Sequence, residues 1–280
     1  MTKKEWTTEK IKNLCLEGLA ISEQTIKACA ECGKEEVDNG DPINTATAAD
    51  VAVSHALLKH FETSKIPAIV HSEESGKKQY GTNPEFLIGF DDIDGTENWR
   101  RSEGIMPYTT IIFVYDKQKP RFEDALVAAM LEHTSGHMWL AVRGEGCYFK
   151  KKEWQNFQRC ETSGQQTLSR KTAVRLDLYA MREDPAVITA LVEAAWVKDA
   201  GSSGYHLAAV SNGCSDAFVN SACKGHEFGA GYLLIKEAGG FIVDNKGLPY
   251  NKKPFDFDEK YNIVCTATEQ LGRAILAKMK

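Results

Sequence analysis

Apolar positions recur along the chain at two spacings, one typical of helices and one of strands. Near the start, Ile11, Leu14, Cys15 and Gly18 begin a series at helical intervals, which predicts an amphipathic helix over about residues 7–32. The same reading predicts a second helix within 45–61. Short, continuous apolar runs follow it and predict buried strands, at 66–70, 86–90 and 108–115.

The remainder of the chain continues this alternation of helices and strands. Strands are predicted at 124–133, 137–149, 172–180 and 241–244, and helices at 185–196, 204–213, 227–240 and 271–280. There is no internal repeat and no long linker. The pattern predicts a layered α/β or α+β fold.

Composition and charge narrow the classes of function. The 280 residues include 34 Lys and Arg against 39 Asp and Glu, a net charge of −5, so the basic bias of a nucleic-acid binder is missing. No apolar run reaches the length of a membrane span, and the first twenty residues lack the apolar segment of a signal peptide. The eight cysteines form no compact framework. We therefore expect a cytoplasmic protein with reduced thiols and neither a nucleic-acid nor a membrane partner.

The most informative segment is an acidic turn directly after the apolar run 86–90. Asp91, Asp92 and Asp94 place three carboxylates within four residues, followed by Gly95 and Thr96. Such a cluster beside a core is costly unless a cation compensates it, and glycine permits a tight turn. Hydroxyl and backbone N–H groups after the turn would suit a phosphate. The segment therefore predicts a phosphoryl-transfer site with a divalent ion.

One interpretation of this turn is the DxDGT motif of haloacid-dehalogenase-type phosphatases, read over residues 92–96. Asp92 would then be the nucleophile and Asp94 the acid and base. That mechanism needs a later Gly-Asp motif to hold Mg²⁺. The only Gly-Asp pair in the chain, Gly40-Asp41, lies upstream of the turn, which counts against this interpretation.

Four motifs in order resemble the inositol monophosphatase family instead. The turn reads DDIDGTEN over 91–98, where the family has D-P-I-D-G-T-x-N. A Thr-x-x-Asp occurs at 47–50 and a Glu-Glu pair follows a strand within 71–75. The segment HEFGAG at 226–231 matches the family's W-D-x-A-A-G, ten residues before the Glu237 of EAGG. The resemblance spans about residues 45–243.

The resemblance implies a Mg²⁺-dependent phosphomonoesterase for a small phosphorylated metabolite, an inositol phosphate or a related sugar or polyol phosphate. Two or three ions would be bound by Glu73, Asp91, the carbonyl of Ile93, Asp94 and Glu227. The catalytic residues would be Asp50, Glu73 and Thr96, with metal-activated water attacking phosphorus in line. The resemblance places phosphate and substrate against Asp94, Gly95, Thr96, Gly201, Ser202, Ser203 and Asn220.

The same resemblance implies αβαβα layers like those of inositol monophosphatases and fructose bisphosphatases. Residues 1–280 would form a single phosphatase domain with two pseudo-halves, about 1–150 with the metal site and 151–280 with the substrate side. A homodimer and inhibition by lithium are also implied.

The sequence departs from the family at several positions. Asp92 replaces proline, His226 replaces tryptophan, Glu227 replaces aspartate, and Asn220 stands where an acidic residue contacts inositol. We expect His226 to be a packing or solvated residue. These changes leave open a 3′(2′),5′-bisphosphate nucleotidase, a fructose bisphosphatase or a histidinol phosphatase, and also a catalytically weakened relative that only binds ligands.

Overall fold

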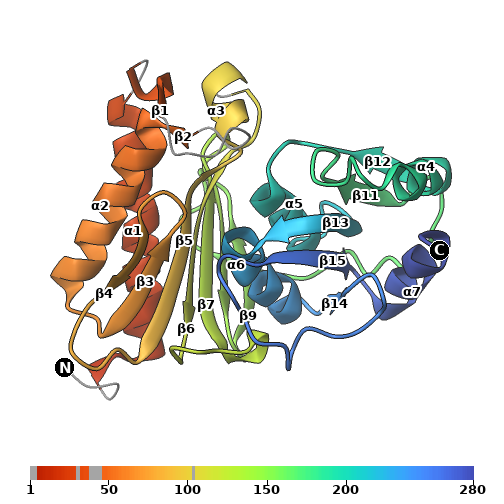
Figure 1. The fold of residues 1–280 in the computed structure, drawn as a ribbon. Coiled ribbons are helices and arrows are strands. Elements are labelled where there is room, and N and C mark those ends of the chain that lie inside the picture. Colours follow the sequence, from red (N-terminus) through yellow and green to blue (C-terminus); the bar gives the residue numbers. More distant parts are fainter. Residues whose placement is uncertain (1–4, 30–31, 38–45, 103–104) are drawn as a thin grey trace.

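The computed structural model describes residues 5–29, 32–37, 46–102 and 105–280, and Gly40 and Asp41 lie outside them. Figure 1 shows helices and sheets alternating across the molecule. The α-helices are α1 (Thr8–Cys29), α2 (Ala48–Ser64), α3 (Thr96–Ser102), α4 (Pro185–Ala194), α5 (Ser203–Ser211), α6 (Gly225–Glu237) and α7 (Glu269–Lys278). Short 3-10 helices occur at η2 (Cys32–Lys34) and η3 (Phe122–Asp124).

The larger sheet has eight strands in the order β10-β9-β8-β7-β6-β5-β3-β4. Neighbouring strands are antiparallel except for the parallel pair β3 and β5. The strands are β3 (Ala68–Ser72), β4 (Gly76–Gln79), β5 (Phe86–Asp94), β6 (Thr109–Tyr115), β7 (Ala125–Glu132), β8 (His137–Val142), β9 (Gly146–Lys150) and β10 (Gln158–Cys160). A two-stranded ribbon, β1 (Glu36–Val37) and β2 (Ala46–Thr47), precedes α2.

The smaller sheet has five strands in the order β12-β11-β13-β15-β14. Strand β11 runs parallel to both of its neighbours, whereas β15 is antiparallel to β13 and β14. The strands are β11 (Ala173–Leu176), β12 (Trp196–Lys198), β13 (Ala217–Lys224), β14 (Phe241–Val243) and β15 (Lys260–Thr266).

Three apolar cores hold these layers together. Strand β6 illustrates the alternation of a pleated strand, because Ile112 and Val114 join the core under α1 and α2 while Ile111, Phe113 and Tyr115 join the core under α5 and α6. A third core packs the smaller sheet against α4 and α7. The predicted αβαβα order is therefore confirmed, and α5 and α6 form the layer between the two sheets (Figure 1).

The largest differences from the prediction lie in the smaller sheet. Its two central strands, β13 and β15, were not predicted, because their buried apolar residues alternate with Asn220, Ser221 and Asn262 in short runs. Strand β5 also extends beyond the predicted 86–90 to include the acidic residues up to Asp94. The chemistry-bearing residues therefore lie on a strand rather than in the turn that follows it.

Among the described helices, none is both long enough and apolar enough to cross a bilayer. The cytoplasmic location remains a prediction from the sequence.

Candidate active site

Strand β5 delivers two carboxylates to the same side of the larger sheet. Residues three apart on a regular strand face opposite sides, but the pairing of β5 with β6 shifts register between Asp91 and Asp94. Because of this irregularity, carboxylate oxygens of Asp91 and Asp94 lie within 4.8 Å of each other and of Glu227 on α6. Asp92, which lies between them in the sequence, is not among the described residues whose ligand atoms lie close enough together to share an ion.

The turn after β5 requires glycine. Gly95 has φ +88°, and a β-carbon there would lie 3.1 Å from the carbonyl oxygen of Gly201 and 3.2 Å from the β-carbon of Ser202. The turn leads directly into α3, so Thr96 is the first helical residue. Asn98 on α3 donates from Nδ2 to the carbonyl oxygens of Pro107 and Ala200, at 2.7 and 2.6 Å. Asn98 therefore links the acidic turn to the residues that immediately precede α5.

A second group of close ligand atoms lies beside the first. Glu73 follows β3, the parallel neighbour of β5, and its carboxylate lies within 4.8 Å of ligand atoms of Asp91 and His226. Asp91 belongs to both groups, so four carboxylates (Glu73, Asp91, Asp94 and Glu227) form one acidic cluster. The structure thus brings together all four predicted carboxylate ligands, from β3, β5 and α6.

The acidic cluster is short of positive charge. Burial, and after it the charges of neighbouring carboxylates, raises the pKa of Asp91 well above its usual value. Burial and Asp94 likewise raise the pKa of Glu227 to about 8. Asp91 Oδ1 is buried without a hydrogen-bond partner among the described residues. Carboxylate oxygens are hard ligands of the kind that Mg²⁺ prefers, and a bound cation would supply the positive charge that this cluster lacks. The residues present therefore fit a divalent cation.

Sequence reasoning missed Lys224, a cation built into this cluster. Its Nζ donates to Glu73 Oε1 at 2.8 Å, and its backbone N–H donates to Glu227 Oε2 at 3.1 Å. Burial opposes its charge, but Glu73 and Glu227 raise the pKa of Lys224. Burial alone would raise the pKa of Glu73, but His226 and Lys224 outweigh this effect and lower the pKa to about 2. The only sequence signal was the position of Lys224, three residues before Glu227.

Asp94 joins the acidic cluster to α5. Its Oδ2 accepts hydrogen bonds from the hydroxyl of Thr109 at 2.9 Å, from the hydroxyl of Ser202 and from the backbone N–H of Gly204 at 2.8 Å. Oδ1 accepts from the backbone N–H of Ser203 at 3.2 Å. The predicted substrate-side residues Ser202 and Ser203 therefore contact the predicted metal ligand Asp94 directly.

The predicted pair Asp50 and Thr96 is also brought together. Asp50 lies in the first turn of α2, where it forms a capping box with Thr47. Thr96 Oγ1 lies 3.3 Å from Asp50 Oδ1 and 2.9 Å from the carbonyl oxygen of Ile93. Burial raises the pKa of Asp50 to about 6, against the opposing hydrogen bonds from Thr47.

Asn220 and Asp92 have less direct positions. Asn220 Nδ2 donates to Asp177 Oδ2 at 3.2 Å, and Asp177 also accepts from the Ser203 hydroxyl at 3.2 Å. Asp177 is thus an acidic residue beside the predicted substrate side, and the sequence analysis missed it. Asp92 is buried and accepts from the Ser72 hydroxyl at 3.3 Å, while burial raises its pKa well above the usual value.

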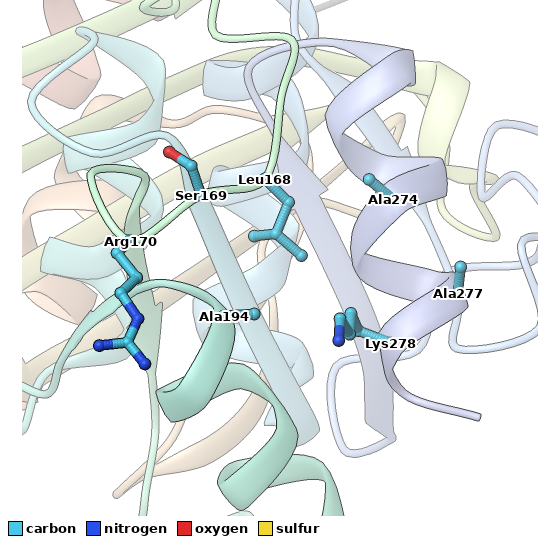
Figure 2. Close-up of a pocket in the computed structure, with 7 residues that line it drawn as sticks. All are labelled: Leu168, Ser169, Arg170, Ala194, Ala274, Ala277 and Lys278. Atoms are coloured by element: carbon cyan, nitrogen blue, oxygen red, sulfur yellow. The ribbon is translucent and has the colours of Figure 1, made fainter.

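A separate pocket of about 670 Å³ lies between the end of α4 and α7 (Figure 2). Its lining contains two cations and no carboxylate. The residues are Leu168, Ser169, Arg170, Ala194, Ala274, Ala277 and Lys278. None of them belongs to the predicted site, so this pocket contributes nothing to the chemistry of the acidic cluster.

Comparison with known proteins gives a consistent result. The model of the "Inositol monophosphatase family" matches residues 9–280. The chain is 26% identical over 211 residues to a bifunctional NADP phosphatase/NAD kinase of Methanococcus maripaludis, covering 71% of this chain but only 37% of that protein. It is 26% identical over 253 residues to a fructose-1,6-bisphosphatase/inositol-1-monophosphatase of Thermococcus kodakarensis, covering 86% of this chain and 88% of the relative.

Solved structures share the fold. The extragenic suppressor protein SuhB of Bartonella henselae superposes with a TM-score of 0.79 at 18% identity, covering 96% of this chain and 98% of that one. A staphylococcal inositol monophosphatase-1, solved as an inhibitory complex soaked in lithium chloride, gives a TM-score of 0.78 at 16% identity over 98% and 95% of the two chains.

Proposed function

The chain belongs to the inositol monophosphatase family of metal-dependent phosphatases, and we propose that it is a Mg²⁺-dependent phosphomonoesterase for a small phosphorylated metabolite. The observation that carries this proposal is the acidic cluster of Glu73, Asp91, Asp94 and Glu227, in which the Lys224 ammonium group pairs with Glu73. Such a charge imbalance next to helix starts and a glycine turn suits a site for cations and phosphate together.

We propose that the acidic cluster, with the carbonyl of Ile93, holds two or three Mg²⁺ ions. When bound, these ions would supply a nucleophile at neutral pH and offset the charge of the phosphate. The chain itself supplies the positions: Asp91 and Asp94 are fixed by β5, and Asp94 is held by donors from Thr109, Ser202 and Gly204. Pre-positioned groups of this kind lower the entropic cost of reaching the reactive arrangement.

The role proposed for Thr96 and Asp50 is to orient the attacking water. The Thr96 hydroxyl can give its single proton either to Asp50 Oδ1 or to the Ile93 carbonyl. While it donates, the lone pairs of its oxygen are free to accept a hydrogen bond from the water. Glu73 is proposed as the acceptor of that water's proton, because its carboxylate lies within 4.8 Å of a ligand atom of Asp91.

On the substrate side, we propose that the backbone N–H groups of Gly95 and Thr96 bind phosphate oxygens. Gly201, Ser202, Ser203 and Asn220 would border the leaving alcohol. Hydrogen bonds join Asp94, Ser203, Asp177 and Asn220 in sequence, which supports one connected wall from the acidic cluster to this border. We therefore propose that the two halves of residues 1–280 act as one catalytic unit.

The class of substrate is proposed from the relatives. They include proteins named for NADP phosphatase, fructose-1,6-bisphosphatase and inositol-1-monophosphatase activities. An inositol phosphate or another sugar or polyol phosphate is our first choice, and a bisphosphorylated nucleotide or fructose bisphosphate is the alternative. Asn220 stands where the family motif has an acidic residue that contacts inositol. It donates a hydrogen bond to Asp177, so this border presents an amide there rather than a free carboxylate.

A second candidate is a weakened relative that binds ligands without turnover. The ion pair of Lys224 with Glu73 favours it, because an ion would have to displace this ammonium group. Titration calorimetry with Mg²⁺ and phosphate analogues that gives binding, while no phosphomonoester is hydrolysed, would support this candidate.

The experiment is phosphate release from a panel of phosphomonoesters with Mg²⁺ or with EDTA. The panel comprises inositol phosphates, fructose bisphosphate, NADP and bisphosphorylated nucleosides. We expect turnover of at least one substrate with Mg²⁺ only, lost in Asp94→Asn and Glu227→Gln. Asp244→Asn, a buried aspartate paired with Lys253 outside the acidic cluster, is the matched control that should retain activity. Turnover in EDTA, or full activity of Glu227→Gln, would overturn the proposal.

Two further properties are proposed from the family resemblance. Inhibition by lithium is supported by the inhibitory lithium chloride complex of the staphylococcal structure, and phosphate release in LiCl against NaCl tests it. A homodimer is proposed from the family's habit, and sedimentation at micromolar concentration tests it.

A further inference from the structure

His226 occupies a position beside the acidic cluster that its expected packing role does not explain. It is the second residue of α6, and its side chain is 9% exposed. Its ring lies 5.4 Å from that of Phe257, measured between centroids, while His71 stacks on Phe257 at 3.9 Å. The packing therefore fixes where the His226 ring lies.

The Nε2 atom of His226 points at carboxylates without forming a hydrogen bond. It lies 3.4 Å from Glu73 Oε1 and 3.6 Å from Asp91 Oδ2, and it is buried with no hydrogen-bond partner among the residues described. A buried nitrogen left in this state is costly. Asp91 Oδ1 is in the same condition, so two orphaned polar atoms occur in one small group.

The spacing of these atoms matches that of ligands around one ion. Nitrogen and oxygen ligands lie about 2.0–2.2 Å from Zn²⁺ or a similar ion, so neighbouring ligands are roughly 3.0–3.5 Å apart. The measured separations of 3.4 and 3.6 Å are close to this range. An ion between the three side chains would give the orphaned Nε2 of His226 a partner.

We propose that Glu73, Asp91 and His226 form a mixed nitrogen–oxygen subsite that binds a divalent first-row transition ion, such as Mn²⁺ or Co²⁺, more tightly than Mg²⁺. Imidazole favours transition ions, whereas Mg²⁺ prefers oxygen ligands and retains water. The proposal rests on the proposed function only in that Glu73 and Asp91 are shared with its metal site. The nitrogen ligand itself comes from this chain's histidine at a position where the family motif has tryptophan.

Lys224 sets a condition on this subsite. Its ammonium group lies 2.8 Å from Glu73 Oε1, the same oxygen that faces His226. An ion at the subsite therefore has to displace Lys224 from that oxygen. A nitrogen ligand that strengthens binding of a transition ion makes this displacement easier for Mn²⁺ or Co²⁺ than for Mg²⁺.

The test uses the full-length protein freed of metal, without substrate. Titration calorimetry measures Mg²⁺, Mn²⁺ and Co²⁺ binding to the wild type, to His226→Gln and to His71→Gln. His71 is the matched control, because it also packs against Phe257 but its Nε2 faces Asp258 at 3.5 Å. We expect His226→Gln to weaken Mn²⁺ and Co²⁺ binding about tenfold or more and Mg²⁺ binding much less, while His71→Gln changes neither.

A spectroscopic measurement on the wild type keeps the proposal testable if a variant fails to fold. Pulsed electron paramagnetic resonance of bound Mn²⁺ should show coupling to a nitrogen-14 nucleus. Lack of that coupling, or equal Mn²⁺ affinity in His226→Gln, would overturn the subsite. Failure of the phosphatase proposal appears separately, as nitrogen coupling in a protein that hydrolyses no phosphomonoester.

Discussion

Lys224 controls how much negative charge the acidic cluster carries before an ion binds. Its ammonium group pairs with Glu73 at 2.8 Å, and both side chains are about one-quarter exposed, at 26% and 25%. Buried pairs cost 3–5 kcal/mol when one partner is removed, and partial exposure reduces that cost. Lys224 is therefore a resident counter-ion of Glu73, and an incoming cation would have to compete with it.

Replacing this lysine should have opposite effects on the free and the metal-bound protein. We expect Lys224→Met to lower the free energy of unfolding in EDTA by about 1–3 kcal/mol, since Glu73 loses its partner. Mg²⁺ should bind more tightly, because no ammonium group has to be displaced. Urea unfolding and calorimetry measure the two effects. Lys253→Met, which removes the ion pair with Asp244 outside the cluster, should leave Mg²⁺ affinity unchanged. Weaker Mg²⁺ binding in Lys224→Met would contradict the counter-ion role.

His133 makes stability depend on pH. The ring stacks on Tyr108, its Nε2 lies 2.9 Å from the Thr110 hydroxyl, and burial lowers its pKa to about 3. The unfolded chain binds this proton at about pH 6.5. The contribution of neutral His133 to the free energy of unfolding is therefore fully present above pH 6.5. It decreases as the pH drops from there towards 3, by up to a few kcal/mol.

The variant His133→Gln should flatten that acid dependence. Urea unfolding of the metal-free protein at pH 7.5, 6 and 5 measures it, with His137→Gln, at the start of β8, as the control. Equal loss of stability in wild type and His133→Gln between pH 7.5 and 5 would show that other groups control the effect.

At the scale of elements, the start of α5 is bonded to the end of β5 in the larger sheet. Ser202 caps α5 by accepting the backbone N–H of Tyr205 at 3.2 Å, and its hydroxyl donates to Asp94 at the end of β5. One side chain thus caps the start of a helix and bonds to a predicted metal ligand.

We expect Ser202→Ala to cost about 1–2 kcal/mol of stability for the lost cap, and to weaken Mg²⁺ binding as well. Thr268→Ala removes the equivalent cap of α7, which accepts from Leu271 at 3.3 Å, and provides the control. Denaturant unfolding and Mg²⁺ titration compare the two variants. If both lose stability alike and Mg²⁺ affinity is unchanged in each, Ser202 is only a cap.

The same scale shows what the sequence could predict. The helices α1, α2, α4, α5, α6 and α7 overlap segments predicted as helices, and the acidic motif follows an apolar run, so these features were predictable. The strands β13 and β15 were not, because short runs interrupted by polar residues carry little periodic signal. The roles of Lys224 and Asp177 depend on contacts with Glu73 and Ser203, which lie far away along the chain.

At the scale of the whole molecule, the acidic cluster lies where β3 and β5 of the larger sheet meet α6 of the central layer. Ion binding should therefore stabilise both halves together. At a hundred times the dissociation constant, a bound ligand adds about 2.7 kcal/mol. We expect a single thermal transition in EDTA that moves up by several degrees in Mg²⁺. Two transitions, of which Mg²⁺ shifts one, would contradict the coupling.

The most direct test of the account is to locate the ions. Anomalous diffraction from a wild-type crystal grown with Mn²⁺, measured at the manganese edge, identifies ion positions independently of activity. We predict peaks bounded by Glu73, Asp91, Asp94 and Glu227, with the Lys224 ammonium group displaced from Glu73. Peaks elsewhere, with Lys224 still paired to Glu73, would contradict the claim that this cluster is the metal centre of a phosphatase.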